Sequence, residues 1–272
     1  MSASSFLSKK MSQEQDDSIH IAPLATSQPL SGQIDPAYPL VNNPEHVEAG
    51  EYFAVLRTRV LNAHERSGAR TILITSAQKG EGKSLISTNL AISLAQLAKH
   101  RILLVDGDLR VAGITELLNL RDQAGITDFL QGTVTFDNII HPSFVPLLSV
   151  IAAGTTPAAA VPGVLEGAKW AEFMENAKKS FDFIIVDSVP VIAPIADFEL
   201  LSAPCDGLLL VVHLHKTNRE LLDRTMQQMN GKLLGVVINN AEPTNGYDYY
   251  SHYYVRTGDT RSRTYRNRAR RS

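Results

Sequence analysis

The sequence contains a single cysteine, Cys205, and this scarcity excludes two kinds of stabilisation. One thiol forms no intramolecular disulfide and supplies too few thiolates for a zinc site built from cysteines. The same scarcity favours a reducing compartment, so we expect a cytoplasmic protein. No uninterrupted apolar stretch approaches the roughly 18 to 20 residues that a membrane-spanning helix needs. The N-terminus also lacks a basic segment followed by an apolar run, so no secretory signal is predicted.

Net charge is small, at −2, but it is unevenly distributed. Residues 256–272 hold seven arginines and one acid, Asp259, which gives a balance of +6 and leaves −8 for the rest of the chain. A short basic tail on an acidic body favours docking or self-regulation and gives little support to nucleic-acid binding. We therefore expect no nucleic-acid partner.

The composition changes twice along the chain, and the changes predict three regions. Residues 1–45 are rich in Ser, Gln, Asp and Pro without a sustained apolar period, which predicts a disordered leader. A helical apolar pattern begins at Glu48, and the apolar core ends after Asn240. We predict one folded domain over 46–241 and a flexible tail over 242–272.

Apolar runs of strand length alternate with helical patterns through the middle of the chain. The runs cover 71–77, 101–108, 147–154, 181–189, 207–214 and 233–240. The helical patterns cover 83–99, 113–120, 163–179 and 217–230. Nearly all the runs are continuously hydrophobic, which is typical of parallel strands buried on both faces. The alternation predicts an α/β fold, a doubly wound and mostly parallel sheet with helices on both faces.

The stretch "SAQKGEGKS" lies between the first strand and the following helix. From Ala77 to Ser84 it fits the spacing of a P-loop, with alanine in place of the first glycine. Small residues let backbone N–H groups turn inward around phosphate oxygens, and the helix N-terminus adds its positive dipole end. The residues expected to bind nucleotide are Gly80, Glu81, Gly82, Lys83, Ser84 and Leu85. Lys83 is expected on the phosphates and Ser84 on Mg²⁺.

Three carboxylates follow two other predicted strands. Asp106 and Asp108 end the run "ILLVDGD", and Asp187 ends "FIIVD". A lone acid at a strand end is as often a helix cap, but three beside a P-loop indicate a site for nucleotide hydrolysis or phosphoryl transfer. One or two of these carboxylates would hold Mg²⁺ together with Ser84, which leaves another, Asp106 or Asp108, to accept a proton.

A cluster of tyrosines follows the core. Its members are Tyr247, Tyr249, Tyr250, Tyr253 and Tyr254. The polar residues between them argue against burial in a core, so the cluster is typical of a substrate segment. A tyrosine hydroxyl has a pKa near 10 and needs a base to attack phosphorus at neutral pH. We predict these tyrosines as phosphoacceptors.

The order of "SAQKGEGKS", "ILLVDGDLR", "IIVDSVP" and the tyrosine cluster resembles the bacterial tyrosine kinases, the autokinases of capsule and exopolysaccharide export. The resemblance runs from about Glu51 through Tyr254, with "DGDLR" similar to the Walker A′ box and "DSVP" to Walker B. It implies a P-loop fold of the deviant Walker type, with ATP and Mg²⁺ as cofactors. It also implies catalytic roles for Lys83, Asp106, Asp108 and Asp187, with Ser84, Asp106 and Asp187 holding the metal. It also implies that Asn239 or Asn240 contacts the adenine.

The resemblance further implies assembly and a membrane partner. The family carries an E-x-x-R-x-x-R pattern that contacts a neighbour in a ring, and here Glu51 and Arg57 are kept while Ala54 replaces the middle arginine. We therefore expect a homo-oligomer, with the strength of its assembly left open. The expected activator is a membrane polysaccharide co-polymerase, which would hold the chain at the inner face of the cell membrane.

Two other functions fit part of the sequence. A partition-type or septum-site-type ATPase switch shares the P-loop, but such proteins carry a lysine where this chain has Gln78. The tyrosine cluster and the "DGDLR" box also argue against a switch. A catalytically weak, nucleotide-binding scaffold of an export complex stays open because of Ala54.

Overall fold

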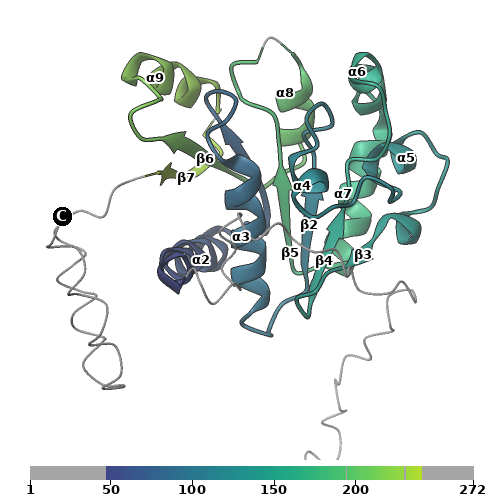
Figure 1. The fold of residues 1–272 in the computed structure, drawn as a ribbon, viewed down its shortest axis with the longest axis horizontal. Coiled ribbons are helices and arrows are strands. Elements are labelled where there is room, and N and C mark those ends of the chain that lie inside the picture. Colours follow the sequence, from purple (N-terminus) through teal and green to yellow (C-terminus); the bar gives the residue numbers. More distant parts are fainter. Residues whose placement is uncertain (1–46, 194, 230, 241–272) are drawn as a thin grey trace, which may run out of the picture.

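A seven-stranded sheet forms the centre of the computed structural model, which describes residues 47–193, 195–229 and 231–240 (Figure 1). The strands are β1 (Thr71–Ser76), β2 (Ile102–Asp106), β3 (His141–Pro142), β4 (Leu148–Ile151), β5 (Phe183–Asp187), β6 (Gly207–His213) and β7 (Leu233–Asn239). Their order is β3-β4-β2-β5-β1-β6-β7. All neighbours pair in parallel except β3 and β4, which are antiparallel.

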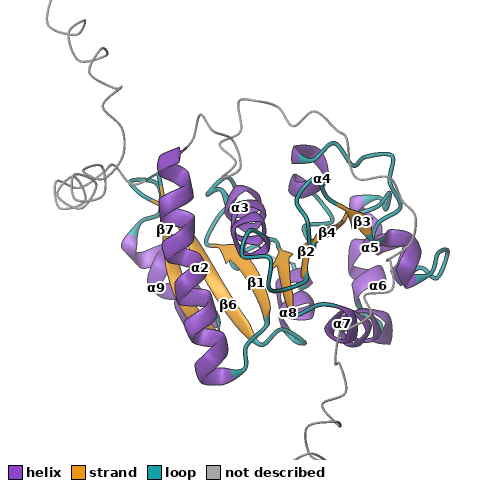
Figure 2. Cartoon of the chain, turned by 90° about the horizontal axis from the view of Figure 1, so that it is seen from below, coloured by secondary structure: helices purple, strands orange, loops and turns teal. Residues whose placement is uncertain are grey.

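Helices cover both faces of this sheet (Figure 2). They are α2 (Val47–Ser67), α3 (Lys83–Ala95), α4 (Gly113–Leu117), α5 (Ile126–Leu130), α6 (Val161–Leu165), α7 (Ala168–Ser180), α8 (Asp197–Ser202) and α9 (Arg219–Gln228), with short 3-10 turns at Phe136–Ile139 and Ala158–Ala160. Helices α2, α3 and α4 pack on one face and α5 to α9 on the other. The predicted doubly wound, mostly parallel fold is therefore confirmed.

Burial explains why the strands read as unbroken apolar runs. Every residue of β1, β2, β4 and β5 is buried, because each strand lies between two layers of helices. Strand β7 differs, since it lies at the sheet edge and leaves Val236 and Ile238 exposed. Its sequence predicted burial on both faces, and its place at the edge makes that prediction wrong.

Two other local predictions were wrong or incomplete. The single helix predicted over 163–179 is two helices, because the extended backbone at Gly167 separates α6 from α7. The sequence patterns also missed α5, α8 and β3, which have six residues or fewer. Elements this short carry too few apolar repeats to show a period.

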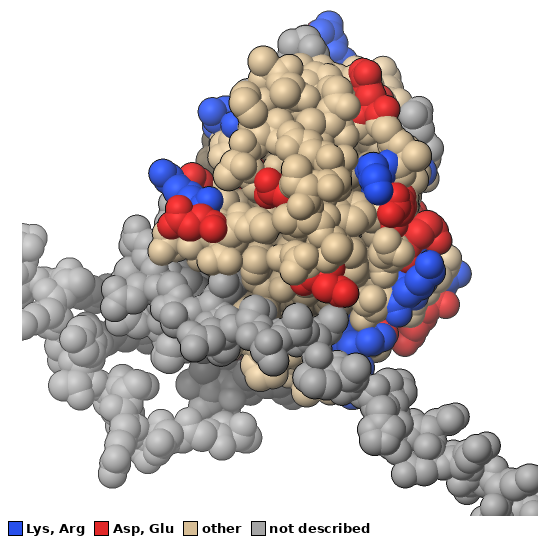
Figure 3. Space-filling model, turned by 90° about the vertical axis from the view of Figure 1, so that its right-hand side faces the viewer, with Lys and Arg blue, Asp and Glu red and all other residues tan. Residues whose placement is uncertain are grey.

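Charged side chains of both signs are distributed over one face of the molecule (Figure 3). Figure 3 shows the side that carries α5 and α6, where described basic and acidic side chains are scattered and mixed in sign. The described part of that face therefore presents no extended area of one charge.

Within the described residues, no helix is both long enough and apolar enough to cross a membrane.

Candidate active site

The P-loop connects β1 to α3 in a conformation that its glycines permit. Gly80 and Gly82 have φ angles of 79° and 93°, a region that residues with a Cβ rarely adopt. A Cβ on Gly82 would also lie 2.2 Å from the Asn239 side-chain nitrogen. Ala77, in place of the first glycine, is buried and needs no such angle. The turn therefore forms despite the departure from the usual motif.

The acids of β2 and β5 lie side by side next to this loop. Asp106 and Asp187 are register partners in adjacent parallel strands, and both are fully buried. Strand β5 lies between β2 and β1, and its Asp187 contacts the start of α3 through Ser84 while Asp106 lies beside it at the carboxyl end of β2. Open parallel sheets bind their ligands at the carboxyl ends of their strands.

Hydrogen bonds join the P-loop helix to Asp187. The Ser84 hydroxyl donates to Asp187 Oδ2 at 2.5 Å, and the Ser87 hydroxyl donates to Asp187 Oδ1 at 3.1 Å. Asp187 therefore has both oxygens occupied by one helix. Its carboxylate and Ser84 are close enough to share one cation.

Asp106 is held from the other side by α4. The Thr115 backbone N–H and hydroxyl both donate to Asp106 Oδ2, at 2.8 and 2.7 Å. The second oxygen, Oδ1, is buried with no hydrogen-bond partner among the described residues. A buried carboxylate oxygen without a donor costs free energy, which makes it a natural ligand for a cation.

Lys83 and Asp108 complete the site. The Lys83 ammonium lies 4.0 Å from Asp108 Oδ2, and both side chains are 7% exposed. Asp108 follows the end of β2, and its neighbour Arg110 forms a two-pronged ion pair with Asp197 of α8, at 2.7 and 3.2 Å. This pair fixes the loop that carries Asp108.

Crowding of acids in a dry pocket raises their pKa values. Burial and the neighbouring Asp187 raise the pKa of Asp106 to about 7 from its ordinary 3.8. Burial raises the pKa of Asp187 to about 6, although Lys83 and Ser84 oppose the increase. Burial also raises the pKa of Asp108 against the opposing charge of Lys83. Two like charges this close favour a divalent cation between them.

The donor set fits a hard cation such as Mg²⁺. Ser84, Asp106 and Asp187 supply only oxygen ligands, and one or two carboxylates suffice because Mg²⁺ keeps several waters. Gly113 packs closely against them, since a Cβ there would lie 2.3 Å from Ser84 Oγ and 3.9 Å from Asp187 Oδ2. The unpartnered, buried oxygen of Asp106 is the observation that fits a cation at this place.

Several expected site residues come together, and others lie elsewhere. Lys83, Ser84, Asp106, Asp108 and Asp187 converge as the sequence predicted. Of the other residues expected on the nucleotide, Leu85 has a partly buried side chain that packs on the core.

Asn239 ends β7 close to the P-loop. Its side-chain amide donates to the Glu81 carbonyl at 2.9 Å, and its Oδ1 accepts from the Asn240 backbone N–H. A contact of Asn239 or Asn240 with adenine stays a prediction.

The residues predicted for assembly lie on α2, away from the acids. Arg57 donates to the backbone oxygen and hydroxyl of Ser93 at 2.8 and 3.1 Å, which joins α2 to α3. Glu51 is exposed. Contact of either residue with a second copy stays a prediction. The five predicted phosphoacceptor tyrosines lie outside the described residues.

Sequence reasoning missed the residues that orient the acids. Ser87 and Thr115 bind Asp187 and Asp106, and Asp197 binds Arg110. Arg110 belongs to the "DGDLR" stretch, which could have singled it out. Ser87, Thr115 and Asp197 stand in ordinary helical sequence, so no local signal marks them.

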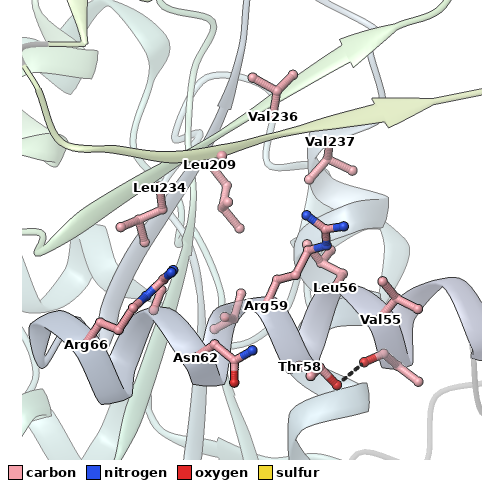
Figure 4. A pocket seen from close by; sticks show the side chains of 14 residues that line it. Val55, Leu56, Thr58, Arg59, Asn62, Arg66, Leu209, Leu234, Val236 and Val237 are labelled. Atoms are coloured by element: carbon pink, nitrogen blue, oxygen red, sulfur yellow. Dashed lines mark hydrogen bonds between the residues drawn. The ribbon is translucent and has the colours of Figure 1, made fainter.

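A separate groove lies between α2 and the strands β6 and β7 (Figure 4). Its volume is about 720 Å³, and its floor includes Leu209, Leu234 and Val237, with Arg59 and Arg66 on the helix side. Lys83 and the three acids of the candidate active site, Asp106, Asp108 and Asp187, do not line it. This groove is therefore distinct from the candidate active site.

Comparison with known proteins gives the class and then the family. Residues 69–231 match a family model described as an AAA domain. The fold and the site thus define a nucleotide-binding P-loop protein. Tyrosine-protein kinase CpsD of Streptococcus agalactiae is 32% identical over 208 residues, which cover 75% of this chain and 89% of that protein. The chain belongs to the bacterial tyrosine-protein kinases.

Solved structures agree with this assignment. The chimerical protein CapA2B2 has a TM-score of 0.68 and 26% identity, over 79% of this chain and 95% of that one. The kinase domain of the Escherichia coli tyrosine kinase ETK has a TM-score of 0.64 over 72% of this chain and 78% of that one. Its identity of 24% is evidence for the fold alone.

The raised pKa values predict how stability changes with pH when no divalent cation is bound. Between about pH 4 and 7 the folded chain keeps protons on Asp106 and Asp187 that the unfolded chain, with pKa 3.8, loses. The free energy of unfolding should therefore fall as pH rises through this range. Denaturant titrations in EDTA at several pH values measure this slope.

Two variants test whether Asp106 causes this pH dependence of the free energy of unfolding. Asp106→Asn should flatten it between about pH 6 and 7, because the group with a pKa of about 7 is gone. Asp206→Asn is the matched control, since the pKa of Asp206 is lowered and its titration lies below this range. A wild-type profile that rises with pH, or one that Asp106→Asn leaves unchanged, would contradict the prediction.

Proposed function

We propose that this kinase transfers the terminal phosphoryl group of ATP to the tyrosines at 247–254, with Mg²⁺ as cofactor. The observation that carries the proposal is the convergence of Asp106, Asp108 and Asp187 on the lysine and serine of the P-loop. The backbone amides of the loop would hold the phosphates, and Lys83 would reach the terminal one. A bound Mg²⁺ neutralises charge on the phosphoryl oxygens.

Ser84, Asp106 and Asp187 would hold the cation, because Asp106 and Asp187 face each other across adjacent strands. Asp108 is then the candidate base. It stands beyond the strand end beside Lys83, where a terminal phosphoryl group and an incoming hydroxyl could meet. The tyrosine oxygen forms a bond to phosphorus, the bond to ADP breaks, and the hydroxyl proton passes to the carboxylate.

The tyrosine cluster supplies the substrate in this proposal. Tyr247 follows Asn240 by seven residues, which span roughly 25 Å at most. That reach permits modification of the same chain or of a second copy. We propose transfer between copies in a homo-oligomer, with Glu51 and Arg57 at the contact between them.

Phosphorylation would also alter such an assembly. Each phosphotyrosine adds about −1.5 to −2 charge, so a modified cluster is repelled by acidic sites and by its own copies. We propose that modification disperses the oligomer and thereby regulates capsule or exopolysaccharide polymerisation and export. A membrane polysaccharide co-polymerase is the proposed activator, and it would hold the kinase at the inner face of the membrane.

A mixing experiment tests the proposal. A chain with all five cluster tyrosines changed to phenylalanine keeps its site but lacks acceptors, and a Lys83→Met chain keeps acceptors but lacks activity. Incubated alone with labelled ATP and Mg²⁺, neither should become labelled. Mixed, the Lys83→Met chain should carry phosphotyrosine.

Each other outcome contradicts a stated part of the proposal. Label on the wild type but not on the mixture would refute transfer between copies. Label on the five-phenylalanine chain would refute the cluster as the acceptor. Release of free phosphate without phosphotyrosine, with the activator's cytoplasmic segment present, would favour an ATPase switch, and nucleotide binding alone would favour a scaffold.

A further inference from the structure

A buried acid in the phosphate-binding loop has no role in the proposed chemistry. Glu81 is fully buried, although a carboxylate at this place would repel phosphates. Its two oxygens are directed at protein groups instead. Oε2 accepts from the Gln78 backbone N–H at 3.0 Å, and Oε1 accepts from the Thr217 hydroxyl. The side chain thus joins the loop to the segment between β6 and α9.

The Thr217 hydroxyl is fixed in direction by a second bond. It accepts from the His213 backbone N–H at 3.2 Å, so its proton is free to point at Glu81. The backbone supports this arrangement, since the N–H groups of Lys216 and Thr217 both donate to the His213 carbonyl. The turn presents a preformed donor to the P-loop.

Lys216 makes a second connection across the same gap. Its ammonium donates to the carbonyls of Lys79 and Gly80 at 3.1 and 3.2 Å, and its own carbonyl accepts from the Gln78 side chain at 3.3 Å. The segment 216–217 therefore binds the P-loop at four consecutive residues, 78 to 81. The Lys216 ammonium is positive and the Glu81 carboxylate is negative, so the two charges offset each other.

We propose that Thr217 and Lys216 are positioning residues for nucleotide binding, which hold the P-loop in its phosphate-binding conformation through Glu81 and the carbonyls of Lys79 and Gly80. The proposal rests on the nucleotide-binding part of the proposed function and not on tyrosine transfer. A loop with two glycines at positive φ has many alternative conformations in the free chain. Bonds that select one of them before binding increase affinity, because less freedom is lost on binding.

The test compares variants that differ in one hydroxyl. Thr217→Val keeps the shape of the side chain but removes its donor and leaves a buried carboxylate short of one partner. We expect the dissociation constant of a Mg²⁺-bound, non-hydrolysable ATP analogue to rise about tenfold, measured by calorimetry. Thr217→Ser, which keeps the hydroxyl, should bind close to the wild type. Thr133→Val is the matched control, since the Thr133 hydroxyl is exposed and donates to the backbone carbonyl of Asp128 in the α5 turn.

Kinetics of phosphorylation separate positioning from a general structural role. For Thr217→Val, KM for ATP should rise about tenfold while kcat at saturating ATP stays within roughly twofold. Thermal unfolding of each variant checks that the fold persists, and Lys216→Met provides a second probe that should also raise KM. Wild-type affinity in Thr217→Val, equal weakening in Thr217→Ser, or a loss confined to kcat would each overturn the proposal.

These readouts distinguish this inference from the proposed function. Binding of the analogue needs no tyrosine acceptor, so affinity can depend on Thr217 even if no phosphotyrosine forms. In that case the tyrosine transfer fails and the role of Thr217 stands. If phosphotyrosine forms normally but the affinity is the same with and without the Thr217 hydroxyl, the tyrosine transfer stands and the role of Thr217 fails.

Discussion

A Lys83→Met variant should phosphorylate tyrosine about 10²- to 10³-fold more slowly than the wild type, because one charged donor to the terminal phosphoryl group is gone. Lys83 is almost fully buried, and its ammonium lies 4.0 Å from Asp108. The change leaves Asp108 and Asp187 without the cation that lowers their pKa values. Both acids should then hold protons at higher pH, which weakens them as base and as metal ligand.

Lys79→Met is the matched control for this change. Lys79 belongs to the same loop, but its side chain is exposed and only its backbone carbonyl is bound by Lys216. Its removal should change the rate by no more than roughly twofold. The measurement is phosphotyrosine formed over time with labelled ATP at saturating Mg²⁺. Comparable losses in both variants, or a Lys83→Met rate near the wild type, would show that Lys83 does not contact the transferred group.

The fold class could be predicted from the apolar runs, because the central strands of the sheet lie between two layers of helices. Strands β1, β2 and β5 are covered on both faces, so their sequences are hydrophobic throughout and their ends fall where acids begin. That is why Asp106 and Asp187 could be placed together before any coordinates. Strand β7 has an equally apolar sequence, yet it is an edge strand, because pairing order is not encoded in a single run.

The residues that support the site could not be predicted in the same way. Thr115 reaches Asp106 only because α4 folds back over the end of β2, and Thr217 reaches Glu81 across 136 residues of sequence. Arg57 bonds to Ser93 of α3, 36 residues away, and no local pattern marks that contact. Partners of this kind depend on tertiary placement, which local pattern does not carry.

A single methyl group at residue 113 should disable the site without harming the fold. Gly113 begins α4 with φ outside the left-handed region, so alanine fits the backbone. The added Cβ would lie 2.3 Å from Ser84 Oγ and 3.0 Å from Ser84 Cβ. Ser84 would have to move away from Asp187, to which it now donates at 2.5 Å.

We therefore expect Gly113→Ala to slow phosphotyrosine formation about 10²-fold, because displacement of one metal ligand misplaces the reacting groups. Its thermal midpoint should stay near that of the wild type. Affinity for nucleotide should fall with Mg²⁺ present and change little in EDTA, since the clash is at Ser84 and not at the loop amides. Gly50→Ala in α2, where a Cβ meets nothing within 4 Å, controls for a glycine change in a helix.

Three results would count against this account of residue 113. Wild-type activity in Gly113→Ala would show that Ser84 can move without cost to the chemistry. An equal loss of affinity with and without Mg²⁺ would place the damage at the phosphates instead of the cation. A large fall in the thermal midpoint would mean that α4 itself needs glycine, in which case the loss of activity reports on folding. Because Ser84, Asp187 and Gly113 come from α3, β5 and α4, the expected pattern requires all three elements to meet at one cation.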